Sequence, residues 1–214
     1  MDSRLVVALD LTDADKLMEI AGNIGGEVFA IKINWPSIMI QGTGIVGELS
    51  RFGKVICDLK IADIPNTNSM IVESVVKMGA WGVISHSFTG GDSLRAAVES
   101  ARNAKVFSVV SMSHPGSSDF INRHTDELIE VSRNAGAYGL IGPGNNPKEL
   151  ARIRKLAGNM VIMTPGVGAQ GGKASEAIRS GSDLVIVGRA VYNSHDPLEA
   201  VRALNLEILE SVQR

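Results

Sequence analysis

Short runs of aliphatic and β-branched residues recur along the chain, and segments of helical periodicity lie between most of them. Runs of roughly four to eight apolar residues bounded by Gly, Pro, Asn or Asp are typical of buried strands. The pattern predicts eight strands, at Leu5–Asp10, Val28–Ile33, Val55–Lys60, Gly82–Ser85, Val106–Met112, Gly139–Gly142, Met160–Pro165 and Leu184–Gly188.

The segments between the strands begin and end at recognisable capping residues. Asp, Thr and Asn side chains cap the first N–H groups of a helix, and Gly often ends one. These signals predict helices at 13–24, 66–79, 92–103, 125–136, 147–158, 173–181 and 197–212. Eight strands that alternate with helices, at a repeat of about 25 residues, favour an α/β fold of the (β/α)₈ TIM-barrel type over a doubly wound sheet. No low-complexity linker divides residues 1–214, so we expect a single catalytic barrel domain.

Composition and charge exclude several classes of protein. The chain has 214 residues, 44% of them hydrophobic, and its net charge of −2 gives no field that would attract nucleic acid or an anionic membrane. No apolar run approaches the roughly 20 residues that span a bilayer, and the first residues lack the pattern of a signal peptide. Cys57 is the only cysteine, which fits a reducing compartment. We therefore expect a cytoplasmic protein that binds neither nucleic acid nor membrane.

Polar residues and glycines follow the ends of the predicted strands. In a (β/α)₈ barrel the loops after the strands form one face, and active sites lie there. The strand-end residues are Asp10, Lys32, Asp58 with Lys60, Ser85 with His86, Ser113, Gly142, Gly166 and Gly188 with Arg189. This ring predicts a polar site at the carboxyl ends of the strands.

The densest group of charges lies in residues 54–67, which read KVICDLKIADIPNT. Side chains alternate along a strand, so Asp58 and Lys60 share one face. Asp63 lies on the following loop, because Pro65 cannot continue a strand ladder. We therefore predict an ammonium group, that of Lys60, held between two carboxylates.

Asp10 and Lys32 end the first two strands with inward parity, and they extend these charges into an alternating acid–base array. Lys60 could form a Schiff base, as in barrels of aldolase type, but that chemistry needs a neutral amine. Flanking carboxylates stabilise the ammonium form instead, which suits a group that donates a proton or stabilises a carbanion beside it. A purely structural set of ion pairs is the alternative interpretation.

The glycine-rich segment 164–173, TPGVGAQGGK, follows the seventh predicted strand. Loops after strands seven and eight form the usual phosphate site of this fold, and Arg189 adds a bidentate donor. The spacing Gly166-x-Gly168-x-x-Gly171 also fits a dinucleotide fingerprint, but only one strand follows it. A merely flexible loop is the alternative, and we favour the phosphate site.

The segment 111–127, SMSHPGSSDFINRHTDE, is long and polar for a loop after a strand, which suggests a lid over a ligand. Within it Ser113 can hydrogen-bond a polar ring, and His114 is either a general acid or an ordinary loop residue. Cys57 points away from Asp58 and is interpreted as inert packing. The other histidines, His86, His124 and His195, lack metal-ligand spacing, so we expect no metal site.

These residues resemble the orotidine 5′-monophosphate decarboxylase family, especially its short, archaeal-type members. Its DxKxxD motif is matched by Asp58-Leu-Lys60-Ile-Ala-Asp63. Further matches follow in the family's order over nearly the whole chain: ALD at Asp10, IKINWP at Lys32, MSHPG at Ser113, PGVGAQGG at Gln170 and VGR at Arg189. The resemblance implies decarboxylation of orotidine 5′-monophosphate to uridine 5′-monophosphate, the last step of de novo UMP biosynthesis, without a cofactor.

The resemblance also implies a role for each matched residue. Lys60 would deliver a proton to C6 and, with Asp58, face the departing carboxylate. Lys32 and Asp10 would hold the ribose hydroxyls and the charge array. The catalytic set is Lys60, Asp58, Asp63 and Lys32. The substrate-binding set is Asp10, Lys32, Ile64, Thr67, Ser113 at the pyrimidine edge, Pro165, and Gln170, Gly188 and Arg189 at the phosphate. Asp63, Ile64 and Thr67 would come from the partner subunit of a homodimer.

Two other functions remain open at this point. The metal-dependent 3-keto-L-gulonate 6-phosphate decarboxylases and hexulose phosphate synthases share the DxKxxD motif but place an acid for Mg²⁺ at the end of the second strand. Lys32 stands there in this chain and would repel a divalent cation. A non-catalytic barrel that binds a phosphosugar or nucleotide would keep its function without Lys60.

Overall fold

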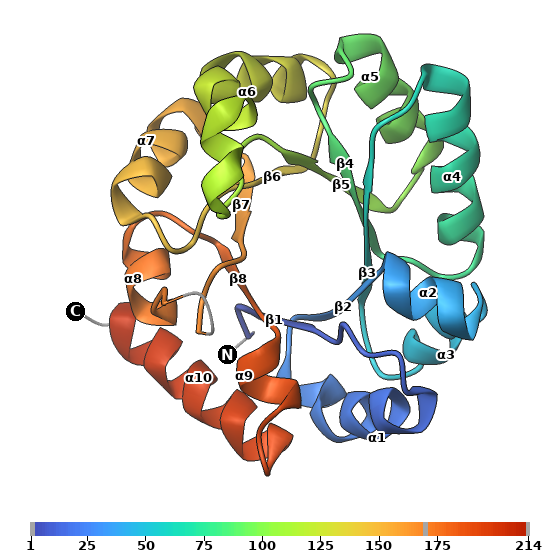
Figure 1. The fold of residues 1–214 in the computed structure, drawn as a ribbon, viewed down its shortest axis with the longest axis vertical. Helices are drawn as coiled ribbons and strands as arrows, with labels where there is room; N and C mark the ends of the chain where they lie inside the picture. The colour runs from blue at the N-terminus through green and yellow to red at the C-terminus, as the bar shows by residue number, and fades with distance from the viewer. Residues whose placement is uncertain (1–2, 169–170, 213–214) are drawn as a thin grey trace.

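The computed structural model describes residues 3–168 and 171–212, and its centre is a closed barrel of eight parallel strands in chain order (Figure 1). The strands are β1 (Leu5–Ala8), β2 (Ala30–Asn34), β3 (Val55–Ile61), β4 (Gly82–His86), β5 (Lys105–Val109), β6 (Gly139–Ile141), β7 (Val161–Thr164) and β8 (Leu184–Val187). The predicted (β/α)₈ barrel is confirmed.

Helices surround this barrel in a single outer ring (Figure 1). The α-helices are α1 (Ala14–Ile24), α2 (Trp35–Gln41), α3 (Ile45–Leu49), α4 (Pro65–Lys77), α5 (Gly91–Ser100), α6 (Thr125–Asn134), α7 (Pro147–Ala157), α8 (Ala174–Arg179), α9 (Arg189–Tyr192) and α10 (Pro197–Val212). The described residues also form the 3₁₀ helices η1 (Gly25–Glu27), η2 (Pro115–Asp119) and η3 (Ile121–His124). Within the described ranges, no helix combines the length and the apolar character that crossing a membrane requires.

The capping signals account for several helix starts. Asp13 accepts a hydrogen bond from the N–H of Lys16 at the start of α1 (3.1 Å), and Asn146 accepts one from Glu149 at the start of α7 (3.2 Å). Side-chain oxygens at these positions satisfy N–H groups that have no acceptor within the helix. The helix predicted to begin at Asn66 begins instead at Pro65, whose fixed φ and missing N–H suit the first helical turn.

Strand ends and one connection differ from the prediction. The fifth strand was expected to reach Met112, but it ends at Val109, whose partner Ile141 is the last residue of the short strand β6. Residues beyond that pair have no ladder partner and form a loop. Between β2 and β3 the hydrophobic pattern gives no helix bounds, and two short helices, α2 and α3, fill this connection.

The amino-terminal half of the barrel interior is filled by aromatic and aliphatic side chains. Phe107 on β5 is fully buried, and a Cβ at Gly139 on the next strand would lie 2.9 Å from its ring. Gly82 on β4 likewise lies beside this ring, so both glycines make room for it. Trp81 packs edge-on against Tyr138 and Phe29. This end of the barrel is closed, and polar groups gather at the other end.

Candidate active site

A cavity of about 330 Å³ opens at the carboxyl ends of the strands. Eight residues predicted for the site line it: Asp10, Lys32, Asp58, Lys60, Ser113, Pro165, Gly188 and Arg189. Three others do not line this cavity within the described chain: Asp63, Ile64 and Thr67. Gln170 lies outside the described residues.

The charged side chains form a chain of ion pairs across the first three strands. The Nζ of Lys32 lies 3.3 Å from Oδ1 of Asp10 and 2.9 Å from Oδ2 of Asp58. The other oxygen of Asp58, Oδ1, lies 2.7 Å from Nζ of Lys60. The order Asp10–Lys32–Asp58–Lys60 therefore alternates in sign, and Asp58 binds both ammonium groups.

One detail of this array corrects the sequence prediction. Among the described residues, the ammonium group enclosed by two carboxylates is that of Lys32, whereas Lys60 forms an ion pair with Asp58 alone. Asp63 is exposed on the loop before α4, and its carboxylate accepts the N–H of Ile64 (2.7 Å). Within the described ranges no ion pair includes Asp63.

Burial and ion pairing oppose one another at Lys32 and Asp58, and pairing prevails. Burial alone would lower the pKa of Lys32, but the carboxylates of Asp58 and Asp10 raise it above its ordinary value. Burial alone would raise the pKa of Asp58, but the ammonium groups of Lys32 and Lys60 bring it below its ordinary value. Each group thus keeps its charge through contact with the others.

Two further titratable side chains lie beside the array. Cys57 is fully buried, and burial together with the nearby charge of Asp58 raises its pKa to about 12, in agreement with its interpretation as inert packing. His86 ends β4 and packs against Phe88, with ring centroids 4.7 Å apart. Burial and the nearby ammonium group of Lys60 lower the pKa of His86 to about 4, so its imidazole is neutral at pH 7.

The segment after β5, expected as a lid, is folded into the two 3₁₀ helices η2 and η3 and held by one amide. The Oδ1 of Asn122 accepts hydrogen bonds from the N–H of Met112 (2.9 Å) and the hydroxyl of Ser111 (3.0 Å). Its Nδ2 donates to the carbonyl of Met112 (3.1 Å) and to the hydroxyl of Ser117 (2.7 Å). Ser113 follows Met112 directly, so it lies between two residues, Met112 and Ser117, that Asn122 holds by hydrogen bonds.

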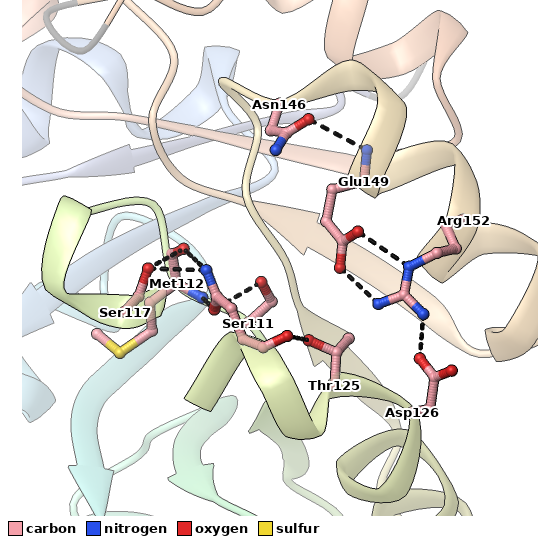
Figure 2. A network of polar contacts seen from close by, with 9 residues as sticks. Ser111, Met112, Ser117, Thr125, Asp126, Asn146, Glu149 and Arg152 are labelled. Atoms are coloured by element: carbon pink, nitrogen blue, oxygen red, sulfur yellow. Dashed lines mark hydrogen bonds and ion pairs between the residues drawn. The ribbon is translucent and has the colours of Figure 1, made fainter. Parts of the chain in front are cut away.

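Figure 2 shows this loop beside the contact between α6 and α7. The guanidinium group of Arg152 binds both carboxylate oxygens of Glu149 (2.9 and 2.7 Å) and also pairs with Asp126 at the start of α6. The pairs are partly exposed, so each stabilises the fold only slightly. They tie together the two helices that flank the loop.

The described residues of the glycine-rich segment after β7, up to Gly168 and from Gly171 on, hydrogen-bond to one another. Gly166, Gly168 and Gly171 have positive φ values of 96°, 76° and 87°. The N–H groups of Gly168 and Gly172 donate to carbonyls within the loop, at 2.8 and 3.1 Å. These two N–H groups are therefore not available to an anion. Arg189 pairs with no carboxylate in residues 3–168 and 171–212, so its charge is available to an anion.

Apolar side chains in the cavity are the residues that sequence reasoning missed. Val109 and Ile141 line it from the last positions of β5 and β6, and Ile84 lines it from the middle of β4. All three have the inward parity of their strands, but an apolar residue at a strand end cannot be told from core by its type alone. Tyr192 on α9 is a further lining residue without a sequence signal.

A closed parallel barrel with a buried, alternating acid–base array at the carboxyl ends of its strands is the architecture of a TIM-barrel enzyme. Comparisons with known proteins then define the family. The family model described as "Orotidine 5'-phosphate decarboxylase / HUMPS family" matches residues 3–204. A Thermoplasma acidophilum protein named orotidine 5′-phosphate decarboxylase is 56% identical over 100% of this chain and 99% of its own length. One of the same name from Thermococcus kodakarensis is 47% identical over 99% of both chains.

Solved structures agree with the sequence relatives. Orotidine 5′-phosphate decarboxylase from Pyrococcus horikoshii superposes with a TM-score of 0.90 at 42% identity, covering 96% of this chain and 99% of that one. The Methanocaldococcus jannaschii enzyme in complex with the inhibitor BMP gives a TM-score of 0.92 at 36% identity, covering 97% and 99%. The chain belongs to the orotidine 5′-phosphate decarboxylase / HUMPS family, and it is an enzyme of that family.

Proposed function

We propose that the protein decarboxylates orotidine 5′-monophosphate to uridine 5′-monophosphate and CO₂ without metal or cofactor, completing UMP biosynthesis. The observation that carries this proposal is the array Asp10–Lys32–Asp58–Lys60 in a cavity that Arg189 also lines. The high identity to proteins named as this decarboxylase supports the same substrate.

In the proposed reaction the bond between C6 and the carboxylate breaks, and its electron pair stays on C6 as CO₂ leaves. Lys60, with its Nζ 2.7 Å from Asp58, would stabilise this carbanion and then deliver a proton to C6. Because the charges are fixed before the reaction, no solvent has to reorganise as negative charge moves to carbon. Solvent would then reprotonate Lys60, whose side chain is 41% exposed.

The remaining site residues would bind the parts of the substrate that do not react. We assign the phosphate to Arg189 and Gly188, with Gln170, the ribose hydroxyls to Asp10 and Lys32, and the pyrimidine edge to Ser113. Pro165 lines the same cavity. Binding energy from a remote phosphate can be used to hold the reacting carbon against the fixed charges.

The test of this proposal is an assay of chelator-treated protein with orotidine 5′-monophosphate, following formation of uridine 5′-monophosphate. We expect full activity after EDTA treatment, because the ammonium group of Lys32 already occupies the position between Asp10 and Asp58 where a cation would bind. Loss of activity on EDTA treatment that Mg²⁺ restores would contradict the proposal and point to the metal-dependent members of the family.

We further propose that the active site is completed by a second copy of the chain. Asp63 and Ile64 are exposed, and large apolar side chains are exposed on neighbouring elements. These side chains are Trp35 (43%), Met39 (76%) and Ile40 (64%) on α2, Ile64 (64%), Met70 (62%) on α4, and Phe88 (49%) after β4. A self-complementary contact over this surface would bury them and bring Asp63, Ile64 and Thr67 to the partner's Lys60.

A hybrid dimer distinguishes this shared site from a site within one chain. Lys60→Ala and Asp63→Ala subunits, each of low activity alone, are mixed under conditions of subunit exchange. If Asp63 acts across the interface, half of the dimers carry one intact site, and activity rises to about a quarter of the wild-type value. Mixing Lys60→Ala with Asp58→Asn subunits should restore no activity, because both substitutions alter the ion-pair array of the same chain. Equal results in the two mixtures would rule out the shared site.

A further inference from the structure

The backbone at Lys60 adopts a conformation that a lysine rarely takes. Its φ is 44°, and among the described residues the only other non-glycine with a positive φ is Arg102. Such a left-handed residue is strained, since its Cβ lies close to the next carbonyl oxygen. Strain of this kind persists only where the surrounding structure enforces it.

The strand register explains where this conformation arises. β3 pairs with β4 at Cys57–Val83 and again at Ile61–Ser85, so residues 58–60 lie opposite a single residue of β4. On the other side, pairing with β2 ends at Asp58. The backbone on both sides of Lys60 therefore lies in a bulge and needs hydrogen-bond partners from outside the ladder.

Two side chains supply these partners. The indole Nε1 of Trp35, the first residue after β2, donates to the carbonyl of Leu59 (2.7 Å). The hydroxyl of Ser85, on β4, donates to the carbonyl of Ile61 (2.9 Å), and this contact is buried. The carbonyls immediately before and after Lys60 are thus each held by a side chain of a neighbouring strand or helix.

We propose that Trp35 and Ser85 are positioning residues for catalysis: by holding the carbonyls of Leu59 and Ile61 they keep Lys60 in its left-handed conformation, with its ammonium group on Asp58. Without either bond the bulge relaxes toward ordinary strand geometry, and the ammonium group moves away from the reacting carbon. Neither side chain lines the cavity. The catalytic part of this inference rests on the proposed decarboxylase function.

The first test separates turnover from binding. Ser85→Ala and Trp35→Phe remove one donor each; the first keeps nearly the same volume, and the second keeps an aromatic ring. We expect each to lower kcat by about 10- to 100-fold, because a displacement of about 1 Å at a reacting group has effects of this size. The affinity for uridine 5′-monophosphate should stay within about twofold, since the phosphate contacts are unaffected. Ser85→Thr, which keeps the hydroxyl group, should retain a kcat near that of the wild type.

Matched controls are available in the same chain. Trp81→Phe changes the other tryptophan, at the closed end of the barrel, and Ser108→Ala removes a buried hydroxyl on β5. Both should leave kcat unchanged. If Ser85→Ala and Trp35→Phe have the same kcat as these controls, the proposal is wrong.

A second test needs no activity and therefore holds even if the decarboxylase assignment fails. Gly adopts a positive φ without strain, so Lys60→Gly should melt at a higher temperature than Lys60→Ala, the reverse of the usual order in a strand. In a Ser85→Ala background this difference should shrink, because the bulge no longer has to keep its left-handed residue. Equal melting temperatures of Lys60→Ala and Lys60→Gly would contradict the proposed role of Ser85 and Trp35. So would a difference between these two melting temperatures that Ser85→Ala does not change.

Discussion

Lys60→Ala is expected to lower kcat by at least about 100-fold, or about 3 kcal/mol of transition-state stabilisation, while the protein still binds uridine 5′-monophosphate. The substitution removes the only charge assigned to both carbanion stabilisation and protonation. Arg189 and Gly188, two of the residues assigned to the phosphate, lie at the start of α9 and directly before it, and they are unchanged. Steady-state assays with orotidine 5′-monophosphate and calorimetric titration with the product measure the two quantities.

Lys16→Ala is the control for this experiment, because Lys16 is exposed in the first turn of α1, outside the cavity. It should have wild-type activity. If Lys60→Ala turns over substrate at the wild-type rate, Lys60 is not the proton donor. The protein would then use a different donor or would be a binding protein.

Asp58→Asn is expected to destabilise the fold by about 3–5 kcal/mol at pH 7, in addition to impairing catalysis. Asp58 is 8% exposed and bonds both Lys32 and Lys60, so its loss leaves the buried ammonium group of Lys32 with Asp10 alone. Asp10→Asn is the control: the Asp10 side chain is 34% exposed and 3.3 Å from Lys32, so its loss should cost under about 1 kcal/mol. Urea unfolding of the three proteins measures both differences.

The pH dependence of this effect follows from the direction of the shift. In the folded protein the pKa of Asp58 lies below its ordinary value of 3.8. Its ionised form therefore stabilises the fold above about pH 4. This contribution is lost as the pH falls through the folded-state pKa. The stability difference between wild type and Asp58→Asn should therefore be constant from pH 5 to 8 and shrink below about pH 4. A difference that grows on acidification would contradict the assignment of Asp58 as a buried carboxylate.

Much of the fold could be predicted because barrel strands are apolar along their whole length and their connections carry ordinary capping signals. Charged residues such as Lys32 and Asp58 were found for the same reason: a charge on an otherwise apolar, buried strand is unusual. The apolar residues Ile84 and Val109 line the cavity without such a contrast, so their sequence context resembles that of the core.

Local geometry at Lys60 could not be predicted, because it depends on contacts between strands. Alternation along β3 correctly places Asp58 and Lys60 together, but it assumes a regular strand and gives no sign of the bulge. The donors that hold the bulge, Trp35 and Ser85, are chosen by the register of β2 and β4, which no local pattern specifies. Whether Asp63 reaches the partner's Lys60 depends on a second chain and stays a prediction.

The burial of Cys57 has a practical consequence for following the barrel in solution. Alkylating reagents react with the nucleophilic thiolate form of cysteine. The Cys57 thiol is protonated and shielded as long as β3 stays between its neighbours. Incorporation of such a reagent, measured by mass, therefore reports how often the strand that carries Asp58 and Lys60 detaches. The natural chain already contains this single internal probe, next to the residues whose movements matter most.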